Sequence, residues 1–224
     1  MNKTTYIHII VFLATLFQTN AGHSQNNLVP NPGFEIHKKC PVTNTAKPRF
    51  ELIPGWTMPT MGTSDYYHKC SRDAGVPYNW AGTKAARSGY AYAGLIAMMH
   101  FGENKPFSVR EYIQAKLKQK LQANKHYLVK FHITLASNSN YAVDGMGLYF
   151  SKREIDSADY IGNLPFEPQI SSKNNKLLYE KDTWTEISGI YEAKGGEEYI
   201  IIGNFKTDKQ TKWIRLNRGS SHHA

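Results

Sequence analysis

Two groups of aromatic and amide side chains have the chemistry to bind a sugar. One lies in a stretch dense in Gly, Pro and aromatic residues, residues 51–80, and the other lies at a turn near residue 138. Aromatic rings offer a broad apolar face, with a polar edge in Tyr and Trp, and amides can bind hydroxyl groups. The predicted ligand-binding residues are Tyr66, Tyr67, Tyr78, Trp80, Asn138, Asn140 and Tyr141.

Each aromatic residue also has a simpler interpretation. Tyr78 and Trp80 could pack beneath the long loop instead of contacting a ligand. Trp56 and Trp184 are expected in the hydrophobic core.

The chain has two cysteines, Cys40 and Cys70, and each has a histidine close to it in sequence, His37 and His68. An even cysteine count in an exported chain predicts a disulfide, which would stabilise the fold by roughly 3–4 kcal/mol. The alternative is a thiolate–imidazole metal site. Neither Cys–His pair has the tight spacing of a zinc site, so the disulfide is favoured.

Two common hydrolase motifs would be signs of catalysis. A serine hydrolase elbow, G-x-S-x-G, and a metalloprotease H-E-x-x-H are both absent from the sequence. Glycoside hydrolysis needs two carboxylates across a cleft, but the acidic residues are few and scattered. We therefore predict that the protein is not an enzyme, and a small hydrolase is the least favoured alternative.

Short alternating segments dominate the chain. Strands are predicted over residues 90–99, 109–115, 125–136, 145–150, 184–193 and 198–205, and Gly195-Gly196 has the composition of a hairpin turn. Residues 116–125 could form a helical turn or a strand end. Few helices and many short strands indicate an all-β, antiparallel β-sandwich with long loops and little helix.

The first 25 residues have the pattern of a secretory signal peptide: a short basic start, an apolar run from Ile9 to Phe17, and small residues before Gln25. We expect no transmembrane segment after cleavage and a single domain over residues 26–224. The net charge is +9, but the basic residues are dispersed, so nucleic acid is not an expected partner. An anionic glycan or lipid surface is physically more plausible.

The stretch Asn27 to Glu35, N-L-V-P-N-P-G-F-E, is predicted to form an edge strand and a turn with a buried Phe34–Glu35 pair, since its prolines cannot donate ladder hydrogen bonds. It resembles the opening of galactose-binding-like jelly-roll modules, among them a group of carbohydrate-binding modules. Gly55-Trp56, Ser88-Gly89 and the run from Leu121 to Phe131 are similar to later motifs of those modules. The likeness extends to exported bacterial envelope proteins in which this jelly roll sometimes precedes an OmpA-like domain.

The resemblance implies several site residues. Glu35 would help to hold a structural calcium ion, with carbonyls near Ser88-Gly89. Arg110 and Glu111 would begin a strand lining the concave face and bind ligand, or would form an internal ion pair. The acidic closing strand of such modules is not visible before Ala224, so the domain is expected to lack its final strand.

These observations predict a non-catalytic binding module that is secreted, in the periplasm or at the outer cell surface. Its expected ligand is a glycan or a cell-wall polysaccharide. The alternative is a structural module that binds an envelope protein and no sugar.

Overall fold

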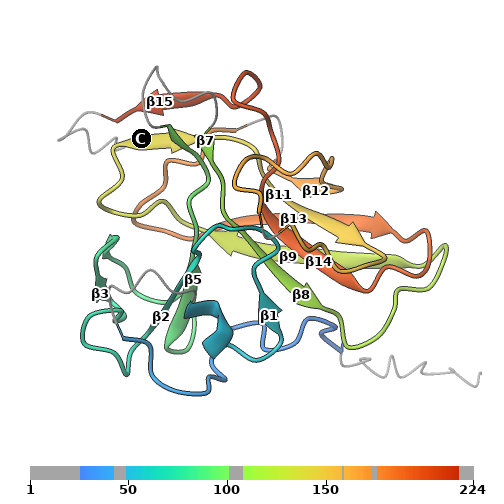
Figure 1. Ribbon diagram of the computed structural model, residues 1–224, viewed down its shortest axis with the longest axis horizontal. Helices are drawn as coiled ribbons and strands as arrows, with labels where there is room; N and C mark the ends of the chain where they lie inside the picture. The colour runs from blue at the N-terminus through green and yellow to red at the C-terminus, as the bar shows by residue number, and fades with distance from the viewer. Residues whose placement is uncertain (1–25, 43–48, 101–107, 158, 173–175, 217–224) are drawn as a thin grey trace, which may run out of the picture.

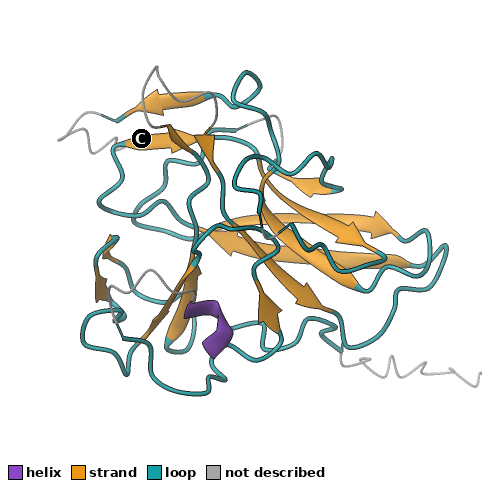
Figure 2. Ribbon diagram, viewed as in Figure 1, coloured by secondary structure: helices purple, strands orange, loops and turns teal. Residues whose placement is uncertain are grey.

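The computed structural model describes residues 26–42, 49–100, 108–157, 159–172 and 176–216. The predicted leader, residues 1–25, lies outside this part of the chain. The described strands are β1 (Trp56–Thr57), β2 (Asp65–His68), β3 (Tyr78–Asn79), β4 (Gly82–Thr83), β5 (Ala91–Gly94), β6 (Met99–His100), β7 (Ser108–Val109), β8 (Tyr112–Lys116), β9 (His126–Ile133), β10 (Tyr141–Val143), β11 (Met146–Ser151), β12 (Ile170–Ser171), β13 (Thr185–Glu192), β14 (Tyr199–Asn204) and β15 (Trp213–Arg215). A short 3-10 helix, η1 (Arg49–Leu52), is the helical segment seen in Figure 2. The prediction of an all-β fold with little helix is confirmed.

The larger sheet has the strand order β1-β8-β14-β11-β12, with antiparallel neighbours (Figure 1). Its central strand β14 is buried along its whole length. The continuous apolar run Tyr199 to Ile202 explains this, because a strand covered on both faces has no need for polar alternation. Ile200 and Ile202 belong to the main core, while Tyr199 and Ile201 pack on the opposite face in a smaller core with Tyr112.

The second layer consists of two separate strand pairs, β9 with β13 and β2 with β5. Val129 of β9, Ile187 of β13 and Tyr66 of β2 share the main core with the inner face of the larger sheet. Among the described residues, no backbone hydrogen bonds join β5 to β9. In that part of the chain, β5 and β9 are therefore not hydrogen-bonded to each other, and each has an edge that no described strand covers.

Two predictions about the strands, one on a hairpin and one on the length of a strand, were wrong. Gly195-Gly196 does not close a hairpin, because β13 pairs with β9 and β14 pairs with β8 and β11. The two glycines, with φ of 91° and 89°, carry the chain from one layer to the other. The strand predicted over residues 90–99 is interrupted, and only β5 and the start of β6 are extended within it.

The opening stretch forms bends and turns and no strand, so that part of its prediction was wrong. Pro30 and Pro32 have no N–H to give to a ladder. The turn is present: the Phe34 amide donates to the Asn31 carbonyl at 3.0 Å, and both residues have positive φ. Phe34 is half-buried and packs against Trp56, with ring centroids 4.9 Å apart. The indole of Trp56 donates back to the carbonyls of Pro30 and Asn31.

The disulfide prediction is confirmed. Cys40 is bonded to Cys70 with Cα atoms 5.8 Å apart, which ties the opening stretch to the end of β2. Within the part of the chain that the structure describes, no helix has the length and apolarity to cross a membrane.

Candidate functional site

A cleft of about 1750 Å³ lies between the two layers of the sandwich. Its floor is the inner face of the larger sheet, and its walls are β9 with residues 134–139 on one side and β5 with residues 95–99 on the other. It therefore coincides with the gap between β5 and β9. The floor residues Met146, Leu148, Phe150, Ile200 and Ile202 make this interior apolar.

The cleft explains the burial pattern of β9. Alternation predicts that Val129, Phe131 and Ile133 point into the core, and all three line the cleft. Val129 is buried, but Phe131 and Ile133 are only half-buried. Their apolar faces therefore contribute a wall that a ligand could contact.

Exposed aromatic rings stand at the rim of the cleft. Trp80 is 56% exposed, Trp213 is 56% exposed and Tyr141 is 48% exposed, and all three line it. Tyr141 of β10 and Trp213 of β15 meet edge to face, with ring centroids 5.9 Å apart. Asn138 donates from Nδ2 to the Trp80 carbonyl at 3.0 Å, so the turn at residue 138 holds the Trp80 loop in place.

A second aromatic pair stands on the wall. Tyr92 of β5 and Trp184 meet edge to face at 5.7 Å, and both line the cleft. The ammonium of Lys84 lies 5.8 Å from the centre of the Trp184 ring and donates to the Lys181 carbonyl at 2.7 Å. Burial lowers the pKa of Lys84, and the charge of Asp182 opposes this shift. The Trp184 indole also donates to the Ala85 carbonyl at 3.2 Å, so a hydrogen bond and a cation–π contact hold this ring on the wall.

Charges of both signs line the cleft, in contrast to the +9 net charge of the chain. The charged lining residues are Lys84, Arg87, Lys130, Asp65, Glu111, Glu180 and Asp208. A polyanion site would need an excess of cations. The cleft is electrostatically mixed, which suits an uncharged ligand.

His132 is a half-buried histidine on the β9 wall. Its Nε2 lies 3.4 Å from Glu186 on the paired strand β13. Burial lowers the pKa of His132, with a further lowering by Arg87, while Glu186 acts in the opposite direction. The imidazole is therefore biased toward its neutral form, in which it can both donate and accept a hydrogen bond.

The structure brings together part of the predicted ligand-binding set. Trp80, Asn138 and Tyr141 all line the cleft although strands β4 to β9 lie between Trp80 and Asn138 in the chain. Tyr67 also borders the cleft, but it is 1% exposed, and its ring packs on Tyr92 at 5.2 Å. Trp80, Asn138 and Tyr141 are the predicted residues that combine exposure with a place in the cleft.

Other members of the predicted set lie elsewhere. Tyr66 is fully buried, and its hydroxyl donates to the Phe34 carbonyl at 2.9 Å. Burial, aided by the charge of Glu35, raises the Tyr66 pKa. Tyr78 is 69% exposed, and neither it nor Asn140 lines the cleft. The Asn140 carbonyl instead accepts from the Leu216 amide at 2.8 Å.

The predicted ion pair between Arg110 and Glu111 is wrong. Adjacent residues in extended backbone point to opposite sides, and these two have different partners. Arg110 Nη2 donates to Asp208 Oδ1 at 2.8 Å and to Thr211 Oγ1 at 3.3 Å. Glu111 accepts from the amide of Thr63 at 2.9 Å, from its hydroxyl at 3.1 Å, and from the Ile96 amide at 2.7 Å.

Both residues are also too buried to serve as a ligand-binding surface in this structure. Arg110 is 0% exposed and Glu111 is 3% exposed, although Glu111 borders the base of the cleft. Burial raises the Glu111 pKa, and the donated hydrogen bonds act against that shift. Through these hydrogen bonds, Glu111 attaches the segments around Thr63 and Ile96 to the chain just before β8.

Glu35 acts as a hydrogen-bond acceptor. The Tyr90 amide donates to both of its oxygens, at 2.9 and 3.2 Å, and Gly89 lies so close that a side chain there would collide with the carboxylate. An amide N–H faces the carboxylate where a cation would need further oxygen ligands. These surroundings do not fit the calcium site that the resemblance implies.

The sequence did not single out Trp213, Tyr92 and Trp184 as site residues. Trp184 was expected in the core but is half-buried on the cleft wall. Trp213 lies in a short, polar C-terminal segment with no periodic pattern. No sequence pattern links Trp213 to Tyr141, and only the pairing of β10 with β15 makes the two residues neighbours.

Comparison of the chain with protein-family models, curated proteins and solved structures finds no match.

Proposed function

We propose that this protein is a non-catalytic binding module whose cleft holds a segment of an uncharged glycan. The observation that carries the proposal is the set of exposed rings, Trp80, Tyr141 and Trp213, along the rim of one large cleft. Such rings can stack on the apolar faces of pyranoses, while neighbouring amide and imidazole groups can bind hydroxyls.

The size and charge of the cleft support a polymeric, uncharged ligand. Sites for small molecules measure roughly 300–1,000 Å³, and this cleft has about 1750 Å³. Its mixture of acidic and basic residues gives no general preference for an anion. Several sugar units of a cell-wall or extracellular polysaccharide would make use of its length.

The test is a titration of tryptophan fluorescence with soluble neutral oligosaccharides of increasing length. We expect quenching or a spectral shift that saturates, with affinity rising until the oligosaccharide spans the cleft. Trp80→Ala should weaken binding about tenfold, since an aromatic contact contributes about 0.5–1.5 kcal/mol beyond its buried area.

Tyr78→Ala is the matched control. Tyr78 is even more exposed than Trp80 and lies in the same loop region, but it is outside the cleft. Its replacement should leave binding unchanged. Equal effects of the two substitutions, or no response to any oligosaccharide, would contradict the glycan proposal.

A protein-binding module is the second candidate, and the open layer favours it. The facing edges of β5 and β9 have no strand between them within the described part of the chain, and the floor beneath is apolar. An extended peptide could add as a strand there. Recovery of an envelope protein that protects the β9 amides from hydrogen exchange, without any sugar response, would favour this candidate.

The proposed family is the galactose-binding-like jelly roll, and the proposed location is the bacterial envelope or the extracellular space. The leader-like residues 1–25 and the opening motif support this proposal, as does the antiparallel sandwich. Detection of the mature chain in a periplasmic or culture-medium fraction would test the location.

A further inference from the structure

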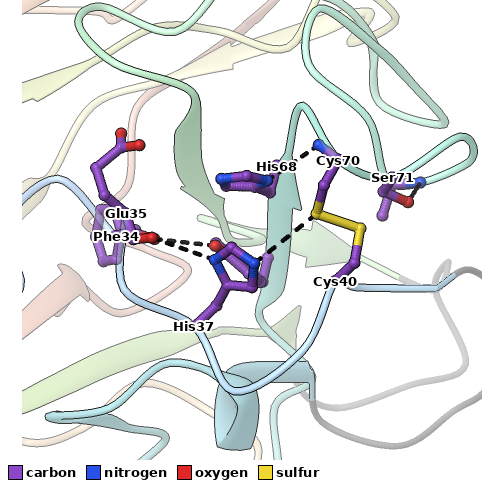
Figure 3. The surroundings of a disulfide bond; sticks show 9 residues. Phe34, Glu35, His37, Cys40, His68, Cys70 and Ser71 are labelled. Atoms are coloured by element: carbon purple, nitrogen blue, oxygen red, sulfur yellow. Dashed lines mark hydrogen bonds between the residues drawn. A yellow bond between two sulfur atoms is a disulfide. The ribbon is translucent and has the colours of Figure 1, made fainter.

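Two imidazoles and two sulfur atoms meet at the disulfide, away from the cleft (Figure 3). The ligand-capable atoms of His37, His68 and Cys70 all lie within 4.8 Å of one another. Cys40 Sγ is bonded to Cys70 Sγ, so a fourth such atom is adjacent. Within the described part of the chain, this is the group of His, Cys, Asp and Glu side chains that is compact enough to hold a metal ion.

His37 is oriented as a ligand. Its Nδ1 lies 3.2 Å from the Glu35 carbonyl, and because a carbonyl can only accept, Nδ1 carries the proton. The lone pair is then on Nε2, which faces Cys70 Sγ at 3.9 Å. An N–H bonded to a backbone carbonyl is the support that metal-binding histidines ordinarily have.

His68 provides the second imidazole from a fixed position. It ends β2 and pairs with Ala91 of β5, and its ring centroid lies 4.4 Å from that of His37. Its Nδ1 accepts from the Cys70 amide at 3.0 Å, so this nitrogen's lone pair is directed toward residue 70. A metal ion on Nδ1 would replace that one hydrogen bond.

The dimensions fit a tetrahedral zinc ion. Zn–N bonds of about 2.0–2.1 Å and Zn–S bonds of about 2.3 Å place ligand atoms about 3.3–3.8 Å apart. The ligand atoms of His37, His68 and Cys70 lie within 4.8 Å of one another, so a pair at that limit would have to approach by about 1.5 Å. The two sulfurs, which are bonded to each other, must separate. The two histidines and Cys40 are half-buried and Cys70 is exposed, so an ion has access.

We propose that this cluster has two chemical states: a disulfide staple when oxidised, and a Cys₂His₂ zinc site made of His37, Cys40, His68 and Cys70 when reduced. A dithiol reductant supplies two electrons and two protons to the Cys40–Cys70 bond and becomes a disulfide itself. The two thiols then lose two protons as Zn²⁺ binds both thiolates and both neutral imidazoles. Either state joins the opening stretch to β2.

The test uses the purified chain, fully oxidised or reduced with a phosphine that is then removed without air. Each form is titrated with Co²⁺, which reports the geometry and ligands of a zinc site. We expect the reduced chain to bind one equivalent, with the strong visible bands of tetrahedral Co²⁺ and a thiolate-to-cobalt charge-transfer band. The oxidised chain should show neither signal.

Variants assign the ligands. His37→Ala and His68→Ala should each weaken Co²⁺ binding by the reduced chain at least about a hundredfold. Loss of a group that only hydrogen-bonds to a metal ligand already costs about 10–100-fold in metal affinity, so loss of a ligand itself should cost at least the upper value. His126→Ala is the matched control, because His126 is an exposed histidine that contacts Glu192 on the paired strand. Co²⁺ binding by the reduced His126→Ala variant should equal that of the unmodified chain.

A melting experiment on the unmodified chain guards against variants that do not fold. Zn²⁺ should raise the melting temperature of the reduced chain and leave that of the oxidised chain unchanged, because a ligand that binds the folded state stabilises it. Absence of a zinc-dependent shift, an octahedral cobalt spectrum, or unaltered binding by His37→Ala would each overturn the proposal. The cluster would then be a disulfide flanked by two imidazoles and nothing more.

Discussion

Arg110 Nη2 lies 2.8 Å from Asp208 Oδ1, and this contact joins the start of the β8 region to a loop after β14. The Arg110 side chain is 0% exposed and that of Asp208 is 39% exposed. Burial lowers the Arg110 pKa, and Asp208 opposes the shift. Arg110, for which the resemblance implied ligand binding or an ion pair with Glu111, is thus a structural cation paired with Asp208.

Removal of the Asp208 carboxylate should lower the free energy of unfolding. Asp208→Ala leaves a buried guanidinium without its charge partner, and such a loss costs about 3–5 kcal/mol of unfolding free energy. We expect the lower end, because Asp208 is partly exposed. Urea denaturation measures the loss. Lys120→Ala, which breaks the more exposed pair with Glu198 at 3.5 Å, is the control and should cost about 1 kcal/mol or less.

Acid should destabilise the protein partly through His132. Its folded-state pKa is lowered from 6.5, so below pH 6.5 the unfolded state binds a proton that the folded state resists. The stability that neutral His132 contributes to the folded state is therefore fully present above pH 6.5. It is lost as the pH falls below 6.5 toward the lowered folded-state pKa. His132→Gln should give a shallower fall in unfolding free energy over this window. An identical slope in the variant would show that the imidazole is not linked to folding.

Glu35 should stabilise the fold through the Tyr90 amide and without calcium. Hydrogen bonds to a charged group contribute about 1.5–3 kcal/mol, so Glu35→Ala should lower the unfolding free energy by about that amount. The melting temperature of the unmodified chain should be the same in calcium chloride and in a chelator. A calcium-dependent rise that Glu35→Ala abolishes would instead support the ion implied by the resemblance.

Trp213 should contribute to ligand binding without supporting the fold. It is 56% exposed and contacts Tyr141 at the rim of the cleft. We expect Trp213→Ala to weaken oligosaccharide binding about tenfold, with a change in unfolding free energy of about 0.5 kcal/mol or less, as for surface substitutions. Calorimetric titration and urea denaturation measure the two effects separately. A large loss of stability with unaltered affinity would assign Trp213 to the fold instead.

Affinity for a neutral oligosaccharide should also be independent of salt. The cleft carries both signs of charge, and an uncharged ligand has no net attraction for salt to screen. A marked decrease in affinity at high salt would indicate that the natural ligand is an anionic glycan.

Much of the strand content followed from local pattern. The alternation of apolar and polar residues from Lys125 to Ala136 predicted β9, and a strand predicted over residues 198–205 matches β14. Two cysteines in a chain with an export signal predicted the disulfide. These features depend on side-chain order along one strand or on residue count, so they are readable without knowledge of the fold.

Which strands pair, and which side chains contact each other, was decided only by tertiary structure. Gly195-Gly196 has the composition of a hairpin turn, yet β13 and β14 lie in different layers, and each pairs with a strand far from it in the sequence. Asp208 and Thr63, the partners of Arg110 and Glu111, come from distant loops. The cleft itself arises where β5 and β9 lie apart, with Trp80, Tyr141 and Trp213 brought to its rim. Local sequence fixes which way a side chain points along its strand, but burial and pairing depend on which other segments fold against it.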